Sequence, residues 1–175
     1  MRGRLKVNRS FALLLVMALT LGPAAGARAG VVHFKELMAI LDLKPPQGWE
    51  VAEKPQGTTI KSPVEMSEAR VSFKTPGDKQ VEVTIIDGVA AGMPYLGQAH
   101  QVVEMESSEE YFKSIEVQGF KGWEAFHFND KRGDLNLNVA NRFLVSFRGE
   151  QMDNNDMLKT LAGQMNLKKL AELAK

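Results

Sequence analysis

The chain has 175 residues, with 22 lysines and arginines, 21 aspartates and glutamates, and no cysteine. The absence of cysteine excludes disulfides, c-type haem attachment, cysteine nucleophiles, thiolate metal sites and a lipoprotein anchor. The near-balanced charge, without a basic stripe, makes the chain a poor binder of nucleic acid and of anionic membrane surfaces.

The N-terminal segment has the three parts of a secretory signal peptide. Residues 1–9 carry four basic side chains and no acidic one, and Phe11–Leu21 is apolar apart from Thr20. This apolar run is about half the length that a membrane-spanning helix needs. Ala27-Arg28-Ala29 then offers small residues at the two positions that a signal peptidase reads. The pattern predicts a periplasmic or secreted protein that is cleaved after Ala29 and keeps no membrane anchor.

Cleavage would leave residues 30–175 as a single exported domain. A chain of this size buries roughly two thirds of its unfolded surface, so one hydrophobic core can hold it without disulfides. Five of the 22 basic residues and none of the 21 acidic residues lie in positions 1–29, which leaves 17 basic and 21 acidic residues. The processed protein is therefore mildly acidic, with a formal charge of −4.

The first half of this domain predicts a helix followed by strands. Apolar residues with helical spacing predict a helix over Phe34–Leu43. Gln47-Gly48-Trp49 is expected to form a turn that leads into 50–53, and a short strand is expected at 57–62. Strict alternation of apolar and polar residues over 68–74 and 80–87 predicts a β-hairpin. Pro76 and Gly77 between them favour a type II turn.

The second half predicts a middle helix, a strand meander and a helical C-terminus. Residues 95–105 have helical spacing, and Ser108 followed by two glutamates suits a helix N-terminus. Residues 117–147 alternate with a period of two, which predicts an antiparallel meander with one apolar and one polar face. Helices are expected over 157–165 and 167–174. The fold class is α+β, an antiparallel sheet of about six strands flanked by N-terminal, middle and C-terminal helices.

Two resemblances accompany this pattern. Pro46-Gln47-Gly48-Trp49 resembles the Pro-x-Gly-Trp element that precedes the six-stranded sheet of the PsbP-like superfamily. Val117–Gly122, followed by strands and a helix, is similar to exported lipoprotein-carrier-like domains. The first resemblance implies a non-enzymatic accessory or binding module, and the second implies a carrier of apolar ligands on a curved sheet. Neither supplies catalytic residues.

The linear motifs contain no enzyme signature. His33, His100 and His127 lack the spacing of a metal-binding pair, and no Gly-x-Ser-x-Gly element is present. Glu109 and Glu110 are adjacent, so on a helix they would point about 100° apart instead of facing one another. We therefore expect no catalytic residues, no metal and no cofactor.

The best candidate for a functional surface is the glycine-flanked segment 88–105. Its apolar side chains either form a ligand or partner surface or fold onto the core; they are Met93, Tyr95, Leu96, Val102 and Val103. Two functions follow. The first is an exported, non-catalytic accessory protein that binds an envelope protein, and the alternative is a carrier that holds a small apolar ligand or lipid between the sheet and this segment.

Overall fold

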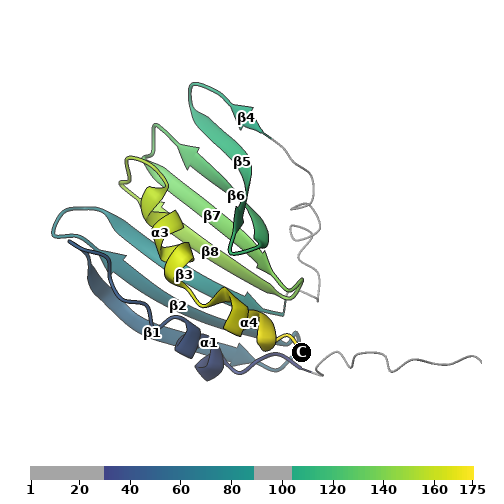
Figure 1. Cartoon of the computed structure of the whole chain (residues 1–175). Helices are drawn as coiled ribbons and strands as arrows, with labels where there is room; N and C mark the ends of the chain where they lie inside the picture. The colour runs from purple at the N-terminus through teal and green to yellow at the C-terminus, as the bar shows by residue number, and fades with distance from the viewer. Residues whose placement is uncertain (1–29, 89–103) are drawn as a thin grey trace, which may run out of the picture.

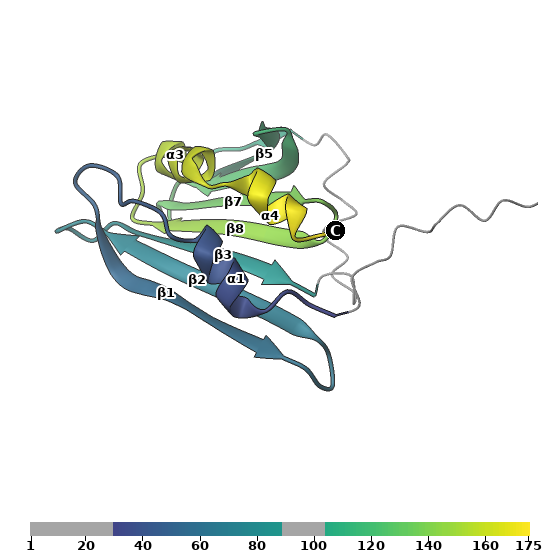
Figure 2. The same ribbon diagram turned by 60° about the horizontal axis from the view of Figure 1, so that its bottom comes forward.

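Alternating apolar residues build an antiparallel sheet of eight strands, with helices packed on one of its faces (Figures 1 and 2). The computed structural model describes residues 30–88 and 104–175. The strand order is β1-β2-β3-β8-β7-β6-β5-β4. The strands are β1 (Glu50–Ile60), β2 (Met66–Lys74), β3 (Gln80–Asp87), β4 (Met105–Glu106), β5 (Glu110–Val117), β6 (Phe120–His127), β7 (Arg132–Val139) and β8 (Phe143–Glu150). The helices are α1 (Phe34–Ile40), α3 (Asp156–Gln164) and α4 (Leu167–Glu172).

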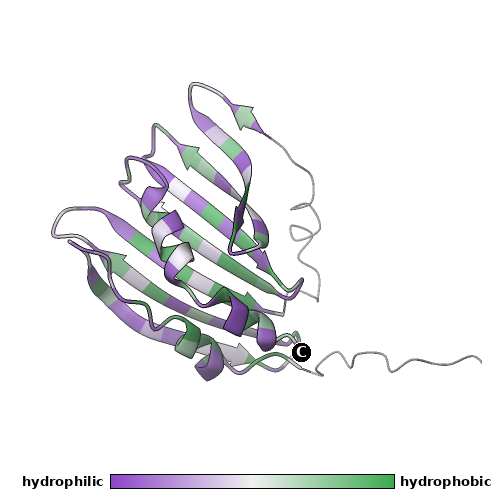
Figure 3. Cartoon of the chain, viewed as in Figure 1, coloured by the Kyte–Doolittle hydropathy of each residue, from purple (hydrophilic) through white to green (hydrophobic). Residues whose placement is uncertain are grey.

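The hydrophobic core lies between the helices and the face of the sheet that they cover, which we call the helix face. Ile85, Val145 and Leu137 are direct neighbours across β3, β8 and β7, and all three are fully buried. Leu161 of α3 and Leu170 of α4 are also fully buried in this core. The opposite side chains of the strands form the outer face, so apolar and polar residues alternate along much of β2 and β3 (Figure 3).

Two paired glycines make the floor on which the start of α3 rests. Gly133 of β7 and Gly149 of β8 are register partners. A Cβ added to Gly133 would lie 2.0 Å from Asn155 Oδ1 and 3.2 Å from Leu158 Cδ1. A Cβ on Gly149 would lie 2.7 Å from Met152 Cγ. The helix can approach the sheet at this point because neither strand presents a side chain there.

The turn between β5 and β6 holds the other end of α3. Gln118 has a left-handed backbone with φ 54°, and its side-chain amide donates hydrogen bonds to the carbonyl oxygens of Ala162, Gly163 and Met165 at 3.1, 3.1 and 2.8 Å. The last carbonyls of a helix lack intrahelical partners, so one side chain satisfies several of them. Asn166 then caps α4 by accepting from Lys169 N–H at 3.0 Å.

The predicted fold class is confirmed at the level of an antiparallel α+β architecture, whereas the expected number of about six strands is too low. The short strand predicted at 57–62 is the end of a longer strand, β1, which begins at Glu50 and stays paired with β2 across two register shifts. The two-residue strand β4 adds an edge. The hairpin of β2 and β3 is confirmed, but its turn is not type II, because Gly77 does not adopt a positive φ.

The expected middle helix is only partly testable. Most of 95–105 lies outside the described residues, while Met105 belongs to β4. The helix start expected at Ser108 is wrong, since Ser107 instead closes a turn that leads from β4 into β5. The N-terminal helix and both C-terminal helices are confirmed, with ends that differ by a few residues from the expected bounds. None of the three described helices has the length and apolarity that a membrane span requires.

Candidate functional site

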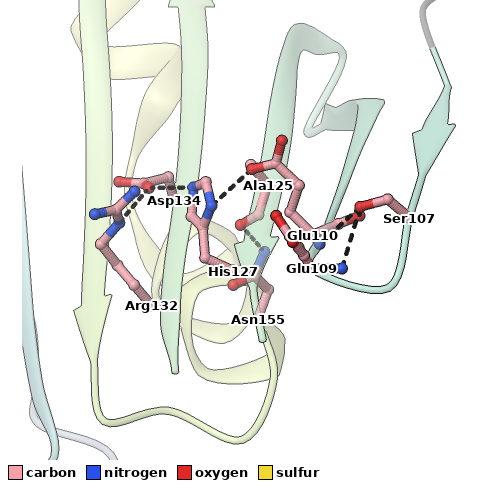
Figure 4. Close-up of polar contacts among 8 residues, drawn as sticks. All are labelled: Ser107, Glu109, Glu110, Ala125, His127, Arg132, Asp134 and Asn155. Carbon is pink, nitrogen blue, oxygen red and sulfur yellow. Dashed lines mark hydrogen bonds and ion pairs between the residues drawn. The ribbon is translucent and has the colours of Figure 1, made fainter. Parts of the chain in front are cut away.

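A network of ion pairs crosses the outer face where β5, β6 and β7 lie side by side (Figure 4). His127 of β6 stands between two carboxylates. Its Nδ1 lies 2.7 Å from Glu110 Oε2 on β5, and its Nε2 lies 3.9 Å from Asp134 Oδ2 on β7. Both ring nitrogens therefore face a carboxylate, and neither is directed at a hydroxyl nucleophile.

Asp134 is the anchor of this network. Its side chain is 12% exposed and meets Arg132 Nε at 3.3 Å and Arg148 Nε at 3.1 Å. A nearly buried carboxylate with two guanidinium partners is satisfied without a metal or a substrate. In the part of the chain that the structure describes, no group of three or more histidine, aspartate or glutamate side chains is placed to hold a metal ion.

The β4–β5 turn sets the position of Glu110. Ser107 Oγ accepts hydrogen bonds from the backbone N–H groups of Glu109 at 3.2 Å and Glu110 at 3.1 Å (Figure 4). Serine forms such local bonds in turns as readily as at helix N-termini. The turn places Glu110 at the start of β5, directly opposite His127.

A second polar cluster lies on the helix face, three residues earlier in β6. Glu124 is fully buried, and its Oε1 lies 3.1 Å from Lys113 Nζ on β5 and 3.1 Å from Lys159 Nζ on α3. Both lysines remain partly exposed, so the two ammonium groups link the buried carboxylate to solvent. This cluster connects α3 to the β5–β6 hairpin through ion pairs. The paired glycines connect α3 to β7 and β8 through close packing.

Tyr111 completes the helix-face cluster. Burial, followed by the charge of the nearby Glu124 carboxylate, raises the pKa of Tyr111 to about 12. The Asn155 side chain, at the N-terminus of α3, hydrogen-bonds the phenol and opposes part of this rise in pKa. The phenol is therefore protonated at physiological pH.

An aromatic pair occupies the outer face beside the ion pairs. The rings of Phe112 on β5 and Trp123 on β6 stack with centroids 5.3 Å apart and an interplanar angle of 28°. Both side chains are half-buried. Next to Phe112, at the β4 edge, an open hollow of about 520 Å³ is lined by Glu104, Met105, Glu106, Tyr111, Phe112 and Lys113.

The residues expected to form the functional surface, namely Met93, Tyr95, Leu96, Val102 and Val103, all lie outside the described residues. His100 does as well. The nearest described neighbours are Glu104 and Met105, at the rim of the hollow. The sequence reasoning also missed both polar clusters. The first cluster follows from the register of one hairpin, in which residue 110 lies opposite residue 127. The Glu124–Lys159 contact joins two segments that no local sequence pattern connects.

Fold and side-chain clusters define an α+β protein with an eight-stranded antiparallel sheet, helices on one face and ion-paired polar groups on both. Comparison with known proteins adds no family to this description. No protein-family model matches the chain, and neither a curated protein nor a solved structure does. The resemblances to PsbP-like and lipoprotein-carrier-like domains therefore remain predictions.

Proposed function

We propose that this protein is an exported, non-catalytic accessory or binding protein of the cell envelope, and that its partner is another protein. The observation that carries the proposal is that the described helices cover one face of the sheet and leave the other uncovered. The helix face is filled by the protein's own side chains, including the fully buried Leu161 and Leu170. The outer face is covered by none of the described helices (Figure 2). It presents the Phe112–Trp123 pair next to charged groups.

Such a surface has the composition of a protein-binding site. Aromatic and arginine side chains supply most of the binding energy at protein interfaces, and charged groups at the rim steer the encounter. Trp123 is a half-buried aromatic anchor, and Arg132 and Arg148 are held in place by Asp134. Because the two ring nitrogens of His127 already face carboxylates, the same groups favour recognition over chemistry.

Site-specific photocrosslinking in the native envelope tests this proposal. A photoreactive residue is placed at exposed outer-face positions, Glu82 and Lys121, and at exposed control positions on α4, Lys168 and Glu172. We expect one discrete crosslinked protein from the outer-face positions and none from α4. Trp123→Ala, checked for folding by circular dichroism, should weaken this product severalfold. Equal products from both sets of positions, or no product from the outer face, contradict the proposal.

The second candidate function is the carriage of a small apolar ligand. The hollow at the β4 edge favours it, because about 520 Å³ is within the usual size range of small-molecule sites. Glu104, Glu106 and Lys113 give this hollow a charged lining, which suits an apolar ligand less well. Native mass spectrometry of protein purified from its own envelope separates the two functions, since a retained lipid-sized adduct supports carriage and its absence argues against it.

A further inference from the structure

The first three described residues are bound to the far end of the central strands. Asp87, the last residue of β3, is 2% exposed, and its Oδ2 accepts a hydrogen bond of 2.5 Å from Val32 N–H. Arg142, in the β7–β8 turn, donates two hydrogen bonds to the same carboxylate, from Nε at 2.9 Å and from Nη2 at 2.8 Å. Its Nη2 also donates to the carbonyl oxygen of Gly30 at 2.9 Å. A bidentate, buried ion pair thus fixes Gly30–Val32 on the sheet.

A second carboxylate, that of Glu65, lies beside Gly30 and forms no ion pair with any of the described residues. The connection between β1 and β2 places Glu65 Oε2 3.5 Å from the position that a Cβ of Gly30 would occupy. An ideal Cβ lies about 2.5 Å from its own backbone nitrogen, so Gly30 N is within roughly 6 Å of this carboxylate oxygen. Glu65, Asp87 and Arg142 together carry a formal charge of −1, so one further positive charge would neutralise the group.

We propose that this group is a binding site for the chain's own processed N-terminus. The inference rests on the proposed export of the protein, since cleavage after Ala29 would make Gly30 the first residue and turn its amide nitrogen into an ammonium. That ammonium lies close enough to Glu65 for an attractive interaction, while Arg142 and Asp87 hold Gly30 and Val32 in position. The precursor has a neutral amide at the same place, so the site distinguishes processed from unprocessed chains by one charge.

The free energy of unfolding of proteins with defined first residues tests the proposal. The described core begins at Val32, so residues 30–175 contain it. One protein begins at Gly30 and the other keeps Ala29 before it, which moves the ammonium by one residue. We expect the unfolding equilibrium constant of the Gly30 protein to be about two to five times smaller, which is the size of an exposed ion pair. Urea denaturation at low salt measures the ratio.

A double-mutant cycle assigns this ratio to Glu65. With Glu65→Gln the ratio should fall to about one. With the matched control Glu68→Gln, a carboxylate on the outer face of β2, it should stay unchanged. Equal unfolding constants for the two starts, or a ratio that survives Glu65→Gln, would overturn the proposal. The intact mass of protein recovered from the envelope tests export separately, because a different first residue removes the processing step from the proposal whatever the cycle shows.

Discussion

At the scale of single residues, the most constrained group is a carboxylate that faces the core. Glu124 is fully buried, and it is ion-paired with Lys113 and Lys159 at 3.1 Å each. Removing the partners of a buried charge lowers the free energy of unfolding much more than replacing the charge and its partners together by apolar side chains of similar size. Substitutions in this cluster therefore show whether ion pairing or apolar packing stabilises the contact between α3 and the β5–β6 hairpin.

Two variants separate these contributions. We expect Lys113→Met with Lys159→Met to lower the free energy of unfolding by about 3–5 kcal/mol, because it leaves the Glu124 carboxylate without a cation. Adding Glu124→Met to this pair should restore most of the loss. Urea denaturation monitored by tryptophan fluorescence gives both values. A triple variant that is as unstable as the double variant would contradict the explanation by an unpaired buried charge.

Tyr111 gives a spectroscopic signature of the same cluster. Its pKa is raised from 10.0 to about 12, so the folded state keeps a proton that the unfolded state releases between these values. The corresponding contribution to stability is complete below pH 10 and falls as the pH rises from 10 to 12. Absorbance at 295 nm should show a tyrosine that ionises only near pH 12, and Tyr111→Phe should remove that step. Ionisation of both tyrosines near pH 10 in the folded protein would contradict the assignment.

At the scale of elements, α3 is positioned by features of the strands beneath it. The glycine floor of β7 and β8 admits its first turn, and the Gln118 amide binds its last carbonyls. Glycine appears at both floor positions for a steric reason. An added methyl group would collide with Asn155 at one position and with Met152 at the other.

Alanine substitution at two glycines tests this seating. Gly133→Ala should lower the free energy of unfolding by about 1–3 kcal/mol, the usual cost of overpacking, because the new methyl group meets Asn155 Oδ1. The control Gly163→Ala lies in α3 with open space around its Cβ, and it should raise stability by about 0.5–1 kcal/mol through helix propensity. Thermal or urea unfolding provides both differences. A neutral Gly133→Ala would show that α3 shifts freely on the sheet.

The same elements show how far the sequence predicts the structure. The β2–β3 hairpin follows from alternation alone, since each of its residues has a partner nearby in the chain. Ser108 followed by two glutamates predicts a helix start, but the neighbouring Ser107 closes a turn, because serine accepts from backbone N–H groups in both settings. Contacts such as that of Glu124 with Lys159 depend on the position at which α3 packs on the sheet, and local periodicity does not predict that position.

At the scale of the whole molecule, the sheet consists of two parts, each made of consecutive hairpins. The strands β1, β2 and β3 form one part, and β4 to β8 form the other. The parts join where β3 pairs with β8 along its full length, and the Arg142–Asp87 ion pair closes one end of this seam. Helix α1 packs on β1 and β2 of the first part, and α3 packs on β5, β7 and β8 of the second. The contact between α1 and α4 and the proposed N-terminal site, which joins Asp87 to Arg142, depend on this non-local pairing.

The seam between β3 and β8 has a consequence for the newly made chain. Arg142 follows Asp87 by 55 residues, an interval that takes roughly 3–11 s at ordinary rates of synthesis. A chain whose first three strands have already paired would have an unpaired β3 edge during that time, and Val81, Val83 and Ile85 would lack their neighbours on β8. An open strand edge invites pairing with a neighbouring chain. Nascent copies on one messenger are thus exposed to strand exchange at β3, and holding the chain unfolded until β8 is complete avoids it.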